Sequence, residues 1–201
     1  MTKAAGTSPA HPALDLAIEI LADLVAFPSV SLQPNDTIVS YIETRMRDLG
    51  MRCVRDAHED GQRFNLLASA GPQRPGGVLL SGHMDVVPAS PDGWTGDPFI
   101  LRRDDGRLHG RGAVDMKGFI AIVLASLPDI MAQADSLSMP LHVALCFDEE
   151  SGFFGASQLP AFFDSIGLRA EIAIIGEPTN MQPFVGHKGG MELTTVVTGT
   201  S

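Results

Sequence analysis

The sequence predicts an α/β fold with a mainly parallel sheet and helices on both of its faces. Apolar runs typical of buried strands alternate with segments of helical periodicity, turn residues separate them, and acidic residues directly follow several of the runs. This order is typical of parallel sheets, because two parallel strands are usually connected by a helix that packs on the sheet. A chain of 201 residues is long enough for one sizeable core and the start of a second domain.

Two amphipathic helices are expected in the N-terminal quarter. The first spans residues 13–26, with apolar side chains at helical spacing and acids on the other face. The second begins at Asn35 or Asp36 as its N-cap and runs to Leu49, after which Gly50 supplies the left-handed position that ends a helix. The expected buried side chains are Leu14, Ala17, Ile18, Leu21, Leu24 and Val25 in the first helix, and Ile38, Val39, Ile42 and Met46 in the second.

One strand is expected to be buried on both of its faces. Residues 78–80 form an unbroken Val-Leu-Leu run after a turn at 75–77, which is typical of a strand buried on both faces. A long irregular section at 89–112 follows, and a loop of that length inside a compact domain is usually functional or disordered. The other expected elements are strands at 51–55, 64–69, 141–147 and 171–175, and helices at 116–134 and 154–166.

The C-terminal residues differ in character from the rest of the chain. Residues 191–197 alternate larger apolar or β-branched residues with polar or smaller ones, a pattern typical of a half-buried strand. That strand would have no partner in the sheet predicted for residues 1–185. We therefore expect residues 186–201 to begin a second domain that the end of the sequence cuts short.

Composition argues against several classes of protein. The apolar fraction of 44% with 19% charged residues is ordinary for a globular protein, so neither disorder nor a membrane span is expected. The net charge of −10 argues against nucleic-acid binding, since there is no basic stripe to neutralise phosphates. Cys53 and Cys146 form no Cys-x-x-Cys pair, and residues 1–12 lack the pattern of a signal peptide, so reducing, cytoplasmic conditions fit best.

Polar residues stand where four of the apolar segments are expected to begin or end. They are His83 and Asp85 after the central strand, Asp115 before the 116–134 helix, the Asp-Glu-Glu run at 148–150, and Glu177 after the 171–175 strand. Because ligands bind at the carboxyl ends of strands in open α/β sheets, we expect these side chains to converge on one edge. Taken singly, His83 could be a loop histidine, the 148–150 run a solvated turn, and Glu177 a helix cap.

Carboxylates gathered around one histidine would repel one another unless a positive ion lay among them. One imidazole with several carboxylates and no thiolate suits zinc or a similar divalent ion, and a shared carboxylate can bridge two such ions. Other chemistries lack their motifs. Residues 110–112 lack the third glycine of a dinucleotide site, residues 117–118 reverse the order of a P-loop, and neither Gly-x-Ser-x-Gly nor His-Glu-x-x-His occurs.

Four segments carry a resemblance to a known family. They are residues 81–88 (SGHMDVVP), 110–118 (GRGAVDMKG), 148–152 (DEESG) and 176–179 (GEPT). These resemble the four metal-site motifs of the dinuclear-zinc amidohydrolase and carboxypeptidase family. That family includes acetylornithine deacetylase, succinyl-diaminopimelate desuccinylase, aminoacylase and glutamate carboxypeptidase. Within it, residues 176–181 and 186–189 are most similar to acetylornithine deacetylase.

The resemblance implies a role for each site residue. His83 and Glu177 would hold one Zn²⁺, Glu150 the other, and Asp115 would bridge both, with Co²⁺ as an alternative metal. Asp85 would orient the His83 ring, and Glu149 would be the general base. An extended backbone at residues 149–150 would point the two glutamates to opposite sides, in keeping with their different roles. The family also has a cis peptide after the bridging aspartate, here Asp115-Met116.

The resemblance also implies the reaction. It would be hydrolysis of the amide bond of an N-acyl amino acid by zinc-activated water, most similar to the conversion of N-acetylornithine to ornithine and acetate in arginine biosynthesis. The alternatives are a desuccinylase or aminoacylase activity, or a non-catalytic metal-binding or interaction fragment. Family members continue into a lid domain that forms a homodimer and then supply a last histidine ligand. We therefore expect residues 1–185 to be the N-terminal part of a catalytic zinc-binding domain, residues 186–201 to begin the lid, and the 201-residue chain alone to be inactive or nearly so.

Overall fold

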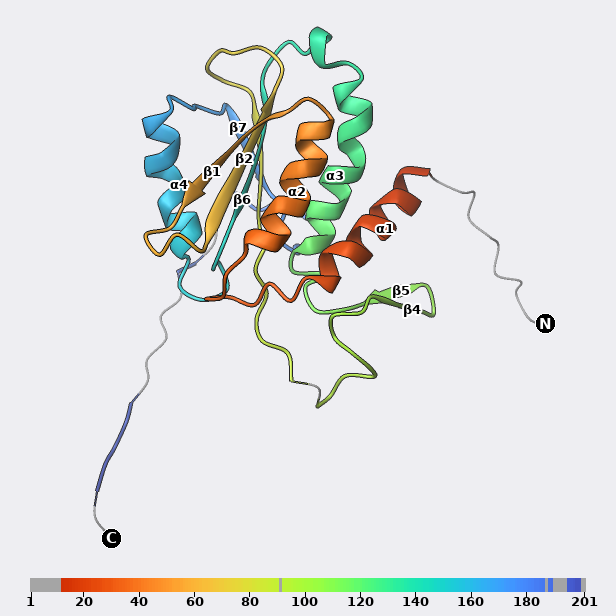
Figure 1. The fold of residues 1–201 in the computed structure, drawn as a ribbon, viewed down its shortest axis with the longest axis vertical. Helices are drawn as coiled ribbons and strands as arrows, with labels where there is room; N and C mark the ends of the chain where they lie inside the picture. The colour runs from red at the N-terminus through yellow and green to blue at the C-terminus, as the bar shows by residue number, and fades with distance from the viewer. Residues whose placement is uncertain (1–11, 91, 187, 190–194, 200–201) are drawn as a thin grey trace, which may run out of the picture.

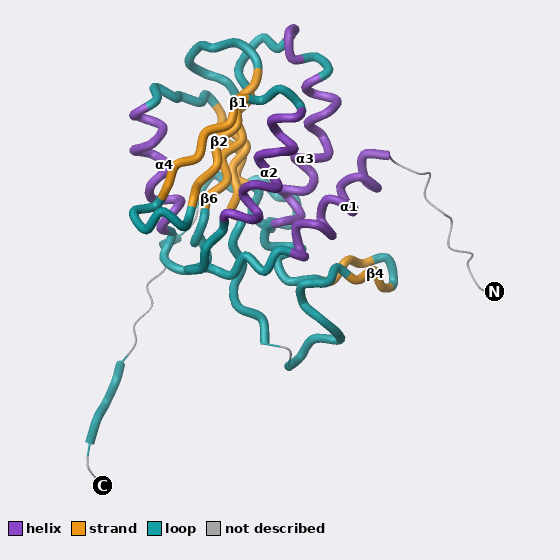
Figure 2. The backbone as a smooth tube through the Cα atoms, in the orientation of Figure 1, coloured by secondary structure: helices purple, strands orange, loops and turns teal. Residues whose placement is uncertain are grey.

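The computed structural model describes residues 12–90, 92–186, 188–189 and 195–199. It has the α/β architecture that the sequence predicts. A five-stranded sheet is covered by α1, α2 and α3 on one face and by α4 on the other, as Figures 1 and 2 show. Among the described residues the helices are α1 (Pro12–Ala26), α2 (Asp36–Asp48), α3 (Lys117–Met131), α4 (Phe154–Ser165) and a short 3-10 helix at Ala134–Ser136.

The sheet is mixed rather than mainly parallel. Its strands are β1 (Arg52–Ala57), β2 (Phe64–Ala70), β3 (Val78–His83), β6 (Leu141–Cys146) and β7 (Ile172–Ile175), in the order β1-β2-β6-β3-β7. The pairs β1–β2 and β2–β6 are antiparallel. For β1 and β2 the reason is the short polar turn that joins them. The pairs β6–β3 and β3–β7 are parallel, as predicted, and this half of the sheet carries the polar strand ends.

The larger core lies between the sheet and helices α1, α2 and α3. The predicted stripe of α2 (Ile38, Val39, Ile42 and Met46) is fully buried, and Gly50 takes the expected left-handed conformation with φ 84°. Asn35 precedes α2, but its side chain bonds the backbone of Phe64 instead of capping the helix. In α1 the prediction is wrong at Leu14, which is 57% exposed because the first turn projects beyond the sheet (Figure 1), and Ile18 is only half-buried. Ile20 is buried instead.

A smaller core lies under α4 on the opposite face. Leu159 of α4 packs with Leu67, Leu79 and Cys146 of the sheet. Cys146 is a free, buried thiol, and burial raises its pKa to about 12, so the residue is structural, as its position inside a strand predicts.

The 89–112 section is more ordered than the sequence suggests. It contains a two-stranded hairpin formed by β4 (Arg102–Asp104) and β5 (Arg107–His109). Strands of three residues are too short to show an alternating pattern, so the hairpin could not be predicted. Trp94 is half-buried, and the guanidinium of Arg111 lies 5.3 Å from the centre of its ring.

The strand expected at 191–197 falls mainly outside the described residues, and residues 195–199 carry no strand. The proposed division at residue 185 therefore stays a prediction. Among the residues that the structure describes, no helix is both long and apolar enough to cross a membrane.

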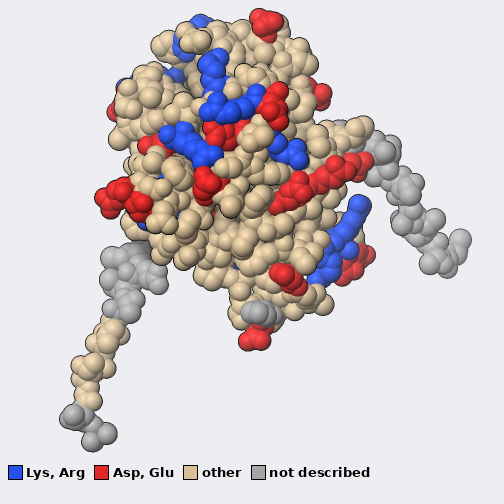
Figure 3. Space-filling view, viewed as in Figure 1, with Lys and Arg blue, Asp and Glu red and all other residues tan. Residues whose placement is uncertain are grey.

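Basic and acidic side chains lie next to one another on the face seen in Figure 3. One such group joins α2 to β1: Glu43 accepts hydrogen bonds from Arg47 at 2.6 Å and from Arg55 at 2.6 Å. Burial alone would raise the pKa of Glu43, but the hydrogen bonds from the two arginines outweigh it and hold the pKa below its usual value.

We predict that Glu43→Gln destabilises the chain in a pH-dependent way. A lowered pKa in the folded state gives stabilisation that is present above the unfolded pKa of about 4.3 and is lost as pH falls through the folded pKa. The substitution should cost about 1–2 kcal/mol near neutral pH and much less in acid. Urea unfolding in the two conditions measures this, with the exposed Glu59→Gln as control. An equal loss of stability in both conditions would show that the charge of Glu43 is not what stabilises.

Candidate metal centre

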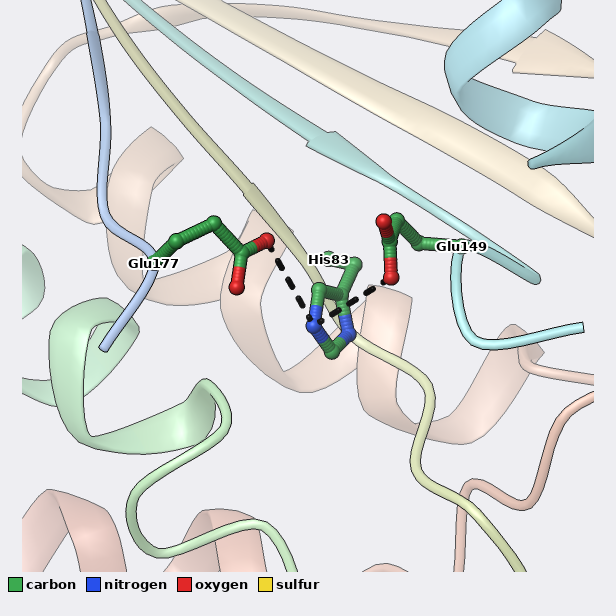
Figure 4. A group of neighbouring side chains, drawn as sticks. All are labelled: His83, Glu149 and Glu177. Atoms are coloured by element: carbon green, nitrogen blue, oxygen red, sulfur yellow. Dashed lines mark ion pairs between the residues drawn. The ribbon is translucent and has the colours of Figure 1, made fainter. Parts of the chain in front are cut away.

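Three parallel strands end at the same edge of the sheet. His83 at the end of β3 pairs with Cys146 at the end of β6, and Ser81 of β3 pairs with Ile175 at the end of β7. The residues that follow β6 and β7 therefore lie beside His83. Figure 4 shows Glu149 and Glu177 approaching the imidazole from two sides.

The ring of His83 is the centre of the group. Its Nε2 lies 3.0 Å from Oδ1 of Asp115, 3.8 Å from Oε2 of Glu149 and 3.9 Å from Oε1 of Glu177. The ring is 1% exposed, whereas the carboxylates around it are partly open to solvent. A buried imidazole nitrogen thus faces carboxylates that are partly exposed to solvent.

Asp115 reaches this edge through the segment that leads into α3. The Asp115-Met116 peptide is cis, as the resemblance implies, and Met116 lies beneath the site, where its Sδ accepts the backbone N–H of His83 at 3.2 Å. Gly112 has φ 79°, and a Cβ at Gly118 would lie 2.5 Å from the carbonyl oxygen of Ala113. Both glycines are therefore needed for this close turn.

Glu149 and Glu150 lie in a turn, and the expected extended backbone at these residues is wrong. The reason is Asp148, which takes a left-handed conformation with φ 48°. Its carboxylate is buried and accepts the backbone N–H of Leu32 at 2.6 Å and the guanidinium of Arg63. A buried ion pair thus holds the start of the turn, and it joins residues 85 positions apart, which no local pattern predicts.

Asp85 contacts His83 in a different way from the one expected. The nearest acceptor to Nδ1 of His83 is the backbone carbonyl oxygen of Asp85 at 2.9 Å, while the carboxylate Oδ1 lies 3.5 Å away. The carboxylate also accepts the backbone N–H groups of Glu149 at 3.0 Å and Glu150 at 3.2 Å. Asp85 therefore links His83 to the turn formed by Glu149 and Glu150 (the glutamate turn).

The electrostatics favour a positive charge among these groups. Burial raises the pKa of Glu150 and of Glu177, and the neighbouring carboxylates raise both further. Burial would lower the pKa of His83, but its bonds to Asp85 and Asp115 outweigh this and raise the pKa to about 9. A divalent cation at this position would supply that positive charge.

The donor atoms fit a metal ion. Two groups of three have ligand atoms within 4.8 Å of one another: His83, Glu149 and Glu177, and His83, Asp115 and Glu150. Donors about 2.0–2.1 Å from a tetrahedral Zn²⁺ lie about 3.3 Å apart, which is within the range measured around Nε2 of His83. The structure therefore brings together every predicted site residue. Which carboxylates bind metal and which one is the base stays a prediction.

No structural role was predicted for Lys117, but its side chain is fully buried next to the site. Its Nζ donates to the carbonyl oxygens of Leu24 at 2.9 Å and Phe27 at 2.7 Å, at the end of α1. Burial lowers the pKa of this amine to about 7. The first residue of α3 is thereby tied to the last turn of α1.

A family model matches more than half of the chain. The model for peptidase family M20/M25/M40 matches residues 79–192, which include all four motifs. The chain belongs to this family. The resemblance of the motifs is thus confirmed, and the M20/M25/M40 proteins are metal-dependent hydrolases.

Individual proteins are also similar to this chain in sequence or in structure. Acetylornithine deacetylase of Klebsiella pneumoniae is 40% identical over 191 residues, which cover 92% of this chain and 48% of the relative. Human carnosine dipeptidase 1 superposes with a TM-score of 0.68 at 27% identity, over 80% of this chain and 38% of that one. An M20 metallo-carboxypeptidase from Sulfolobus solfataricus has a TM-score of 0.69 at 21% identity, over 80% of this chain and 37% of that one. The chain thus spans about half the length of the curated relative.

Proposed function

We propose that this protein hydrolyses the amide bond of an N-acyl amino acid in a metal-dependent reaction, with N-acetylornithine as substrate and ornithine and acetate as products. The observation that carries the proposal is the ring of carboxylates around the buried His83, in a chain that is 40% identical to an acetylornithine deacetylase. On this proposal the protein acts in the cytoplasm in arginine biosynthesis.

Each site residue has a proposed role. His83 and Glu177 would hold one ion, Glu150 a second, and Asp115 both; Zn²⁺ is proposed, with Co²⁺ as the alternative. Asp85 orients His83 and fixes the glutamate turn through the hydrogen bonds described above. Bound ions would supply Lewis-acid chemistry, lowering the pKa of water and polarising the acyl carbonyl.

Glu149 is proposed as the general base. Its carboxylate lies 3.8 Å from Nε2 of His83, which is close enough to contact a water molecule held at the site. It would accept a proton as the water oxygen bonds to the acyl carbon, and return that proton to the nitrogen as the carbon–nitrogen bond breaks. The free amine and the carboxylate then leave.

The substrate is tested in a version of the protein that has the full length of its relatives. Release of free amine is measured from N-acetylornithine, from N-succinyl-diaminopimelate and from acylated apolar amino acids, before and after removal of metal by a chelator. We expect turnover of N-acetylornithine that a chelator abolishes and Zn²⁺ restores. Preference for one of the other two would reassign the substrate, and hydrolysis that survives complete metal removal would contradict the mechanism. A full-length protein that binds metal but hydrolyses none of them would favour the non-catalytic alternative.

The 201-residue chain is tested by its metal content. We expect about one Zn²⁺ per chain after equilibration and desalting, because His83, Asp115 and Glu177 all lie in the described part of the site. We also expect turnover far below the order of 10 per second that is typical of enzymes, since the chain spans about half of the relative's length. A folded chain without zinc would contradict the ligand assignment for the isolated half.

A further inference from the structure

The segment between α1 and α2 lies against the residues that follow β3. The backbone N–H of Ser31 donates to the carbonyl oxygen of Val86 at 3.1 Å, and the N–H of Val86 donates to that of Ser29 at 3.0 Å. Val30 and Val86 thereby form an isolated parallel bridge. The position of Ser31 is thus fixed by the backbone, whatever its side chain does.

Two buried serines in this segment have different partners. Ser29 is 7% exposed and donates its hydroxyl to the carbonyl oxygen of Met84 at 2.7 Å. Ser31 is 6% exposed and donates its hydroxyl to Oδ2 of Asp85 at 2.6 Å. Both hydroxyls satisfy a buried acceptor, but only the acceptor of Ser31 is a charged group of the metal centre.

The hydroxyl of Ser31 completes the contacts of the Asp85 carboxylate. Oδ1 accepts the N–H of Glu149 and faces Nδ1 of His83, while Oδ2 accepts the N–H of Glu150 at the longer distance of 3.2 Å. Hydrogen bonds to a carboxylate are short and strong because the acceptor is charged. Without the Ser31 hydroxyl, Oδ2 would keep only the weaker of the two backbone contacts, and rotation of the carboxylate about its Cβ–Cγ bond would be less restrained.

The next residue of the same segment, Leu32, contacts the residue that precedes the glutamate turn. The N–H of Leu32 donates to Oδ1 of Asp148 at 2.6 Å, directly before Glu149 and Glu150. The segment therefore contacts both carboxylates on which the turn rests, those of Asp85 and Asp148.

We propose that Ser31 is a positioning residue of the metal centre: it locks the Asp85 carboxylate in the orientation that fixes the His83 ring and the glutamate turn together. This inference rests on the proposed function, because it treats His83 and Glu150 as metal ligands. Groups behind a ligand typically change metal affinity or activity 10- to 100-fold when removed. Ser31 lies one contact further out than Asp85, and we expect the low end of that range.

The test compares Ser31→Ala with Ser29→Ala in the 201-residue chain. Each substitution removes one serine hydroxyl, and the two serines are buried to nearly the same extent on one segment. We expect Ser31→Ala to weaken Zn²⁺ binding about tenfold in a chelator competition. It should also alter the visible absorption spectrum of the Co²⁺ form, which reports the geometry of the ligands. Ser29→Ala should lower the unfolding midpoint by a similar amount but leave both metal readouts unchanged.

Two further variants guard against a loss of folding. Ser31→Thr keeps the hydroxyl and should restore metal affinity. Ser31→Cys keeps the volume but donates only weakly, and should bind metal less tightly than wild type even if Ser31→Ala does not fold. Wild-type affinity in Ser31→Ala or Ser31→Cys, or an equal loss of affinity in Ser29→Ala, would overturn the proposal.

Failure of this inference is distinguishable from failure of the proposed function. If the full-length protein hydrolyses none of the acylated amino acids while Ser31→Ala still weakens metal binding, the function is wrong and the role of Ser31 stands. If the full-length wild type hydrolyses N-acetylornithine and Ser31→Ala has the same kcat and metal affinity, only the role of Ser31 is wrong. A wild type that binds no metal at either length would overturn both.

Discussion

Glu149→Ala is expected to lower kcat of the full-length protein by about 10²- to 10⁴-fold, the contribution that a general base typically makes. The metal content should stay that of wild type, because on our assignment the Glu149 carboxylate moves a proton and holds no ion. Amine release and elemental analysis of the same samples measure the two quantities. Glu59→Ala, at an exposed acid that is not among the groups around His83, should change neither.

Two other outcomes would contradict the role assigned to Glu149. Loss of one metal ion together with activity would make Glu149 a ligand, which its grouping with His83 and Glu177 would accommodate. Full activity in Glu149→Ala would show that another group is the base. Glu150→Ala should instead lose metal and activity together.

Lys117→Met is expected to destabilise the 201-residue chain by about 1–3 kcal/mol, because the carbonyl oxygens of the buried Leu24 and the half-buried Phe27 would each lose the hydrogen bond from the amine. Methionine keeps most of the volume of the side chain, so a cavity contributes little. The cost of burying the amine, visible in its lowered pKa, offsets part of the loss. Urea unfolding without metal measures the change, and Arg107→Met, on the exposed β4–β5 hairpin, should leave the stability unaltered. A Lys117→Met chain as stable as wild type would show that the backbone N–H groups of Phe27 and Ser29, which donate to the same two oxygens at 3.2 and 2.8 Å, satisfy them without the amine.

The sequence predicted those features that depend on local pattern. The apolar stripe of α2, the parallel pairing of β3 and the acids at the strand ends follow from periodicity and from the ends of parallel strands, and all are found, although Val78 and Leu80 of β3 are only half-buried. What it missed depends on contacts between distant residues. Ser31 and Asp85 are 54 residues apart, and Arg63 and Asp148 are 85 apart, so no spacing rule connects them. The left-handed Asp148 decides the glutamate turn, and aspartate is compatible with many backbone conformations.

The order of strands in the sheet has a consequence for synthesis of the protein. β1 and β2 can pair as a hairpin as soon as both are made, but β3 lies between β6 and β7, which are both translated later. At about 5–20 residues per second, a ribosome needs several seconds to pass from His83 to Glu177. Until β6 is made, β3 has neither of its neighbours, and all three carboxylates that lie around Nε2 of His83 follow it in the chain. A nascent chain of this protein therefore has a paired hairpin well before it has anything that could hold a metal ion.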